Sequence, residues 1–167
     1  MGRRTKPQLL SIEEGVGKMR AALAGRQDKN LVIVGRSSSI AVTGVADTVA
    51  RAKAYEAAGV DAFFLAGAKT RAELETVAAA IKIPLVIGTS APELQDLDYL
   101  ATQHVRICIQ GHLPIAAAAR AVYETMKALR EGTPPKDVPG IASPELMKRV
   151  TRDADYRRWI REFLGGA

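Results

Sequence analysis

Short, continuously apolar stretches alternate along this chain with longer segments in which apolar positions recur at helical spacing. The apolar stretches predict strands over residues 30–35, 60–67, 83–90 and 105–111. The longer segments predict helices over residues 11–26, 45–59, 70–81, 91–103 and 113–132. Strand and helix alternate strictly, and the strands are apolar throughout. The pattern therefore predicts an α/β fold with a parallel sheet, buried on both faces under helical cover.

Local signals mark several of the predicted helix ends. Ser11 can cap the first helix, and Glu14 completes a capping box with it. Gly59 is placed to end the second helix as a C-terminal cap. The third helix is expected to begin near Thr70 or Arg71. Four such strand–helix units fit either an open sheet or half of an eight-stranded barrel, and periodicity alone does not decide between them.

The C-terminal part of the chain has a different pattern. Residues 133–142 are rich in proline and predict a linker, whereas residues 143–167 predict one or two short helices. The last helix carries an apolar stripe, and such a stripe usually docks on the body of the protein or on a partner subunit. The stripe consists of Tyr156, Trp159, Ile160 and Phe163.

Charge and cysteine content narrow the choice of partners and compartment. The formal net charge is +6, but the basic residues near the C-terminus are interleaved with acidic ones and no nucleic-acid-binding motif accompanies them, so we expect solvated surface charge and no nucleic acid. No apolar run reaches the roughly 18 residues that a membrane span needs, so no membrane is expected. The lone cysteine, Cys108, cannot form an internal disulfide, which favours a cytoplasmic location.

Polar and charged residues follow the predicted strands at their carboxyl ends, where parallel α/β folds gather their binding sites. Arg36 can hold a carboxylate or phosphonate through two hydrogen bonds, or it can be a surface arginine paired with an acid on a helix. Ser37 and Ser38 can donate to the same anion, or they can cap a turn. Gln110 and His112 follow the fourth strand. The imidazole can protonate or orient a substrate oxygen, or it can have no chemical role.

The chain resembles the isocitrate lyase/phosphoenolpyruvate mutase superfamily in four stretches: "DKNLVIVGRSSSI", "ADTVARAKAYEAAGVDAFFLAG", "IPLVIG" and "VRICIQGHLPIAAAARAVYETMKALREG". The "RAKAYEAAGVDAFF" block is fairly specific, and its combination with "GRSS" and "GH" is more so. Within the superfamily, the "GH" after the last strand looks most like the oxaloacetate decarboxylase branch.

The resemblance implies a TIM-type α/β barrel, a Mg²⁺ ion and a small α-keto acid substrate. The implied enzyme is a carbon–carbon lyase that acts through an enolate, most like oxaloacetate decarboxylase, which converts oxaloacetate to pyruvate and CO₂. Arg36 matches the family's arginine for a substrate carboxylate or phosphonate, and His112 matches a histidine that lies over the substrate. The family's long last helix is exchanged between subunits, which implies a homo-oligomer with residues 113–131 at an interface.

The resemblance covers only the second half of such a barrel. We therefore expect residues 1–132 to form the C-terminal half of an α/β barrel, residues 133–142 a linker and residues 143–167 a helical extension. In the family the metal ligands lie in the first half, so we expect none of them here and weak or no turnover by this chain alone. A truncated product, half of a split enzyme and a half-barrel that pairs with itself all stay open.

Two other interpretations of the sequence remain, and each assigns the chain a different kind of function. The chain can be a non-catalytic half-barrel that serves as a binding or assembly module, because an unclosed sheet leaves two edges that proteins usually cover by oligomerising. It can also be an open flavodoxin-like sheet that binds phosphate at "GRSSS" and "GTS".

Overall fold

The computed structural model describes residues 8–88, 91–111 and 113–165. The chain folds into two units, Met1–Gly111 and His112–Ala167. The first unit holds the sheet and the helices that cover it, and the described part of the second contains helices joined by loops.

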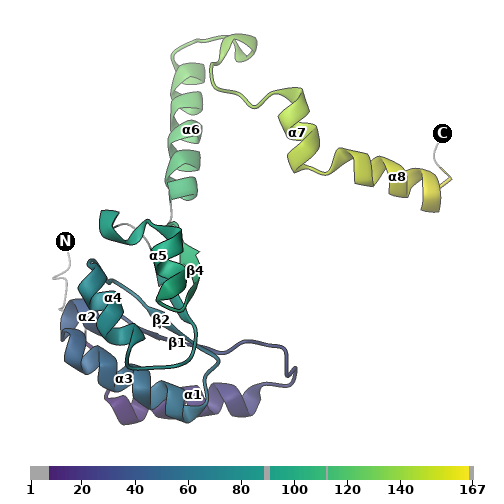
Figure 1. Cartoon of the computed structure of the whole chain (residues 1–167). Helices are drawn as coiled ribbons and strands as arrows, with labels where there is room; N and C mark the ends of the chain where they lie inside the picture. The colour runs from purple at the N-terminus through teal and green to yellow at the C-terminus, as the bar shows by residue number, and fades with distance from the viewer. Residues whose placement is uncertain (1–7, 89–90, 112, 166–167) are drawn as a thin grey trace. The chain divides into compact units, whose positions relative to one another are not determined.

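The sheet of the first unit is parallel throughout, and its strands are neighbours in the order in which the chain makes them. A sequential order winds the chain in one direction, as a barrel requires, whereas a flavodoxin-like sheet reverses direction at a switch point. The alternative of a flavodoxin-like sheet is therefore wrong, and the predicted α/β class with parallel strand–helix units is confirmed. The strands are β1 (Val34–Ser37), β2 (Ala62–Leu65), β3 (Leu85–Gly88) and β4 (Val105–Ile109) (Figure 1).

The predicted helix caps of the first unit form as expected, but the helix predicted over 91–103 is divided into Pro92–Leu94 and Leu97–Thr102, and the short helix Ser39–Val42 was not predicted. Ser11 and Glu14 form the expected reciprocal capping box, and Thr70 forms a second one with Glu73. Gly59 ends its helix in the left-handed conformation, with φ of 97°. The elements are α1 (Ile12–Gly25), α2 (Ser39–Val42), α3 (Val45–Ala58), α4 (Arg71–Ala78), η1 (Pro92–Leu94) and α5 (Leu97–Thr102).

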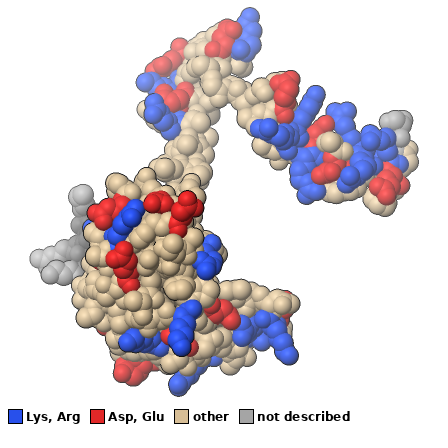
Figure 2. Space-filling model, in the orientation of Figure 1, with Lys and Arg blue, Asp and Glu red and all other residues tan. Residues whose placement is uncertain are grey.

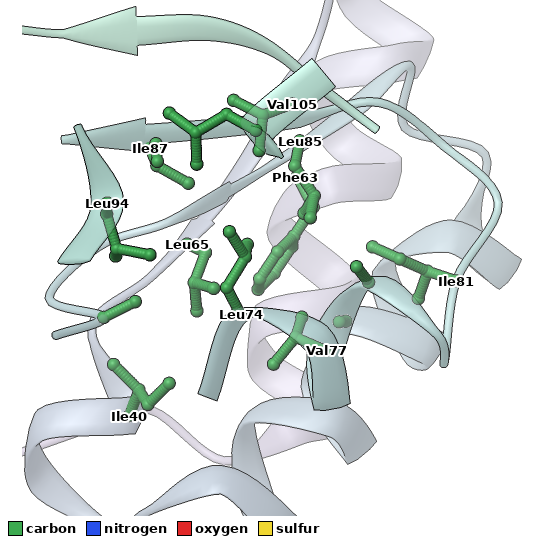
Figure 3. Packing of buried hydrophobic residues seen from close by; sticks show 14 of the residues in the cluster. Ile40, Phe63, Leu65, Leu74, Val77, Ile81, Leu85, Ile87, Leu94 and Val105 are labelled. Carbon is green, nitrogen blue, oxygen red and sulfur yellow. The ribbon is translucent and has the colours of Figure 1, made fainter. Parts of the chain in front are cut away.

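One face of the sheet packs on these helices and forms the core. Phe63 and Leu65 of β2 are fully buried, as are Leu74 and Val77 of α4 (Figure 3). Leu85 and Ile87 of β3 extend the same cluster. Burial of this apolar area is the main source of stability for the first unit.

The opposite face of the sheet is only partly covered. Ile107 and Ile109 of β4 are 56% and 42% exposed, and Val34 of β1 is also exposed, whereas Val86 of the inner strand β3 is buried. The expectation that every strand is buried on both faces is therefore wrong for the two edge strands. The helices of the first unit cover one face, and in a closed barrel the other face is filled by side chains of strands across the barrel.

The described part of the second unit consists of α6 (Leu113–Arg130), η2 (Pro135–Asp137), α7 (Pro144–Val150) and α8 (Asp153–Phe163). No residue of α6 is buried, although the helix carries many apolar side chains. Lys and Arg side chains on α7 and α8 are interspersed with Asp and Glu (Figure 2), and three ion pairs within α8 and its preceding residue join the two signs. In the described ranges, the helices lack the length and apolarity that a bilayer crossing requires.

Candidate functional site at the carboxyl rim of the sheet

Arg36 lies on the face of β1 that the helices do not cover. Gly35 and Ser37 alternate with it and are buried toward the helices, whereas Arg36 itself is exposed. Its guanidinium lies over the ring of Phe64, 5.5 Å from the ring centroid. The two residues are Cα partners in neighbouring strands, so the contact follows directly from the register. The ring restricts where the cation can lie but leaves its N–H groups open to an anion.

The serines that follow Arg36 do not point the same way. The Ser37 hydroxyl is buried and donates to Ser39 Oγ over 2.8 Å. Ser39 Oγ is in turn 2.7 Å from Thr48 Oγ1 on α3. Ser38 is half-buried between these two serines and makes no side-chain capping bond to α2. Of the two predicted anion donors, Ser37 therefore faces the helices, whereas Ser38 is partly exposed at the end of the strand.

Gln110, expected after the fourth strand, lies at the same rim as Arg36 but at the other edge of the sheet. Gln110 follows β4 directly and is exposed. β1 and β4 are separated by three strand spacings, or about 14 Å in a flat sheet. The structure thus places Arg36 and Gln110 at one rim without bringing them into contact. His112 lies outside the described residues.

Two residues at this rim were missed by the sequence reasoning. Phe64 was read only as part of an apolar strand, yet it supplies the surface beneath Arg36. Thr48 was read only as a helix residue, yet it is fully buried and joins the serine turn to α3. A strand alignment would have signalled Phe64, because Arg36 and Phe64 occupy matching positions in consecutive strands.

A second polar group on α3 supports the same turn from outside. Asp47 accepts hydrogen bonds from Arg51 Nε at 2.7 Å and from Thr43 Oγ1 at 2.6 Å. The Arg51 guanidinium, and after it the Thr43 hydroxyl, lower the pKa of Asp47 below its ordinary value. Arg51 is buried and also donates to the Leu10 carbonyl over 2.8 Å. These contacts hold the helices together, and they do not belong to the open rim of the sheet.

The opposite rim of the sheet carries a different polar contact. Asp61 Oδ2 accepts from Arg26 over 2.8 Å and from the Ile33 amide over 2.7 Å. These bonds join the end of α1, the entry to β1 and the entry to β2. Asp61 precedes β2, and its contacts there are those of a structural residue.

The residues present do not fit a magnesium site. Across the described ranges, no three His, Cys, Asp or Glu side chains are grouped closely enough to hold a metal ion. The polar groups at the β1 rim are a guanidinium and hydroxyls, which suit an anion and not a divalent cation. We derive no chemical step through a metal from these residues.

Comparison with known proteins agrees with this fold. The chain is 58% identical over 160 residues to a protein named oxaloacetate decarboxylase from Bradyrhizobium diazoefficiens, covering 96% of this chain and 56% of the relative. A solved phosphonopyruvate hydrolase superposes with a TM-score of 0.76 at 33% identity, covering 96% of this chain and 60% of that one. A 2,3-dimethylmalate lyase of the PEP mutase/isocitrate lyase superfamily superposes with a TM-score of 0.76 at 23% identity, covering 92% and 56%.

A family model for phosphoenolpyruvate phosphomutase matches residues 1–130, which is most of the chain. The chain, whose sheet is parallel and singly wound, belongs to this family of α/β proteins. The superfamily recognised from the motifs is confirmed. The chain spans about half the length of the curated relatives it matches.

Proposed function

We propose that this chain carries the anion-binding part of a carbon–carbon lyase for small α-keto acids, most like oxaloacetate decarboxylase. The observation that carries the proposal is the exposed guanidinium of Arg36, held over Phe64 at the carboxyl rim of a parallel sheet. A relative that is 58% identical and is named oxaloacetate decarboxylase supports the choice of substrate.

In this proposal Arg36 binds a carboxylate of oxaloacetate through two N–H donors. Its planar fork matches a carboxylate, and the underlying ring reduces the freedom that binding would remove. Loss of CO₂ breaks the bond to the departing carboxylate carbon and leaves the electron pair on the remaining enolate, which takes up a proton to give pyruvate. A substrate held by one end is oriented for that cleavage, and such orientation contributes substantially to rate.

We assign the other predicted rim residues to the same ligand. Ser38 supplies a hydroxyl beside Arg36, and Gln110 supplies an amide from the far edge strand. His112 hydrogen-bonds a substrate oxygen or controls protonation of the product. Ser37 acts through its neighbours, because its hydroxyl already donates to Ser39.

The proposal includes Mg²⁺ as the cofactor, held by residues outside this chain. The described residues offer no ligand cluster for it. Catalysis by this chain alone is therefore proposed to be weak or absent, because electrostatic stabilisation of the developing negative charge is usually the largest contribution to catalysis.

A homo-oligomer that uses residues 113–131 is part of the proposal. Apolar side chains are exposed along both halves of α6, including Ile115, Val122 and Met126. An exposed apolar helix of this length is typical of a protein interface. A cytoplasmic location is proposed from the single cysteine in the sequence.

A titration of the purified chain with oxalate, the two-carbon dianion, tests the proposed site. Calorimetry should show binding to the wild-type chain and to Arg20→Met, a control that removes an exposed arginine of α1. Binding should be lost in Arg36→Met. An Arg36→Met variant that binds oxalate as tightly as the wild type overturns the assignment of Arg36.

The alternative function, a non-catalytic half-barrel for binding or assembly, is favoured by the exposed Ile107 and Ile109 on the open sheet face. A pyruvate-release assay with oxaloacetate and Mg²⁺, run alongside light scattering, separates the two functions. Pyruvate release that is lost in Arg36→Met supports the enzyme. An oligomer that neither binds oxalate nor releases pyruvate supports the module.

A further inference from the structure

The strand that carries Arg36 runs into a buried chain of three hydroxyl groups. Ser37 Oγ lies 2.8 Å from Ser39 Oγ, which lies 2.7 Å from Thr48 Oγ1. Thr48 Oγ1 lies 2.9 Å from the carbonyl oxygen of Gly44, which is the last acceptor in this series of hydrogen bonds. All three side chains belong to buried residues. A buried polar chain is retained only when each member is satisfied, because an unpaired hydroxyl in the interior is costly.

The Gly44 carbonyl determines which hydroxyl donates and which accepts along this series of hydrogen bonds. The Gly44 carbonyl can only accept, so the Thr48 hydroxyl donates its single proton there. Thr48 Oγ1 must therefore accept from Ser39, and Ser39 Oγ must accept from Ser37. Ser37 Oγ accepts from the Ser39 amide at 3.1 Å, which closes the arrangement. Every hydroxyl proton is used, so none of the three hydroxyls can donate to a ligand without breaking the chain.

These bonds hold the turn on both sides of Ser38. Ser37 and Ser39 are each bonded toward the helix layer, while Ser38 between them is partly exposed. The Ser39 carbonyl is held as well, because it accepts from the Thr43 amide at 2.7 Å and from the Gly44 amide at 3.0 Å. The hydroxyls of the two serines that flank Ser38 thus bond to α3 through Thr48, which lies nine residues beyond Ser39.

We infer that Thr48 is a positioning residue for anion binding at the β1 rim. By accepting the Ser39 proton, it keeps the turn in the conformation that sets the position of Ser38 relative to Arg36. The inference rests on the proposed function for the identity of the ligand, but the positioning itself is a property of the turn and is measurable without ligand.

The test replaces Thr48 by Val, which has nearly the same shape but no acceptor for Ser39. In ¹H–¹⁵N spectra of the full chain, the Ser38 amide and the Arg36 Nε–Hε resonances should shift or broaden. The affinity for oxalate should fall by about tenfold, since the two donors no longer converge. Thr48→Ser retains the hydroxyl and should restore both readouts.

Two control variants separate positioning from general damage. Thr76→Val removes a hydroxyl on α4 that also donates four residues back, to the Ala72 carbonyl over 2.7 Å, but contacts nothing in the turn. Asp61→Ala removes contacts at the opposite rim and should lower stability without moving the Arg36 resonance. If Thr48→Val does not fold, Ser39→Ala breaks the same chain with the loss of one atom and should give the same two changes.

The outcomes distinguish this inference from the proposed function. Oxalate binding that survives Arg36→Met overturns the proposed function, while the resonances still report on the turn. Unchanged Ser38 and Arg36 resonances in both Thr48→Val and Ser39→Ala overturn the inference. Resonance changes that Thr48→Ser fails to reverse also overturn it, because the hydroxyl would then not be the cause.

Discussion

Gly35 of β1 lies against the ring of Tyr55, so closely that a Cβ atom at this glycine would lie 2.8 Å from Tyr55 Cδ2. Tyr55 is buried on α3 and its ring is tilted against Phe63, 6.0 Å between centroids, so it has little room to move away. The glycine before Arg36 is therefore a packing requirement: it allows α3 to lie close to β1.

Substituting Gly35 by Ala is expected to lower the free energy of unfolding by about 1–3 kcal/mol, because overpacking forces a shift of the ring or the strand. Urea denaturation followed by circular dichroism measures this. The matched control is Gly17→Ala on α1, where a Cβ meets nothing within 4 Å and the better helix former should leave the protein as stable or more stable by about 0.5–1 kcal/mol. Equal stability of Gly35→Ala and wild type would contradict the packing argument.

Gly15→Ala tests the other end of the Tyr55 side chain. A Cβ at Gly15 would collide with the Tyr55 hydroxyl, and Gly15 is the buried residue of α1. We expect destabilisation of roughly 1–3 kcal/mol and partial recovery in the double variant Gly15→Ala/Tyr55→Phe, which removes the colliding atom. The measurement is a double-mutant cycle from urea midpoints. Purely additive effects would show that the two residues do not interact.

Phe64→Leu tests the contact beneath Arg36. The substitution keeps an apolar side chain but removes the ring face over which the guanidinium lies. Because a cation–π contact at an exposed site is worth about 0.5–1 kcal/mol, the affinity for oxalate should fall by roughly two- to fivefold. Calorimetric titration measures this, with Phe64→Tyr as the variant that keeps the ring and the affinity. A Phe64→Leu variant that binds oxalate with wild-type affinity would show that Phe64 does not contribute to the anion site.

Asp61→Ala tests the division between the two rims of the sheet. The carboxylate accepts from Arg26 and from the Ile33 amide, so its removal should cost about 1–3 kcal/mol of stability. Because these contacts lie at the rim opposite Arg36, affinity for oxalate should not change in the folded protein. Thermal unfolding measures the stability of the variant, and calorimetric titration of the same sample measures its affinity for oxalate. A large loss of affinity at temperatures where the variant is folded would refute the separation.

The lowered pKa of Asp47 predicts part of the loss of stability that this fold should show at acidic pH. Its pKa is lowered in the folded chain by the Arg51 guanidinium and then by the Thr43 hydroxyl. Such a carboxyl stabilises the fold above its unfolded pKa of about 3.9, and this stabilisation is lost as pH falls through the lower, folded value. Asp47→Asn should be less stable by roughly 1 kcal/mol near neutral pH and should lose less stability on acidification.

Urea midpoints at about pH 7, 5 and 3 compare the Asp47→Asn variant with the wild type. Glu13 and Glu145 also have lowered pKa values from local backbone and serine hydrogen bonds, and they are present in both proteins. The difference between the two curves therefore isolates Asp47. Parallel curves at all three values would contradict the assignment.

The elements of this protein were predictable because their causes are local. The capping box at Ser11, the helix start near Thr70 and the C-terminal cap at Gly59 are encoded within a few residues and formed as expected. The strand that carries Arg36 differs most clearly from its predicted bounds. It was predicted over 30–35 and forms over Val34–Ser37, because a strand's limits are set by its neighbour, and β2 pairs only with that later segment.

The alternation of strand and helix, the capping signals and the family motifs were enough for the sequence alone to determine the α/β class, the order of the elements and the family. Only the tertiary structure decided which face of each edge strand is covered, that Ser37 turns inward while Arg36 remains exposed, and that Phe64 and Thr48 take part in the arrangement. The reason is physical. Periodicity and caps depend on neighbours in the chain, whereas these contacts join residues from different elements, and strand register and helix packing bring such residues together.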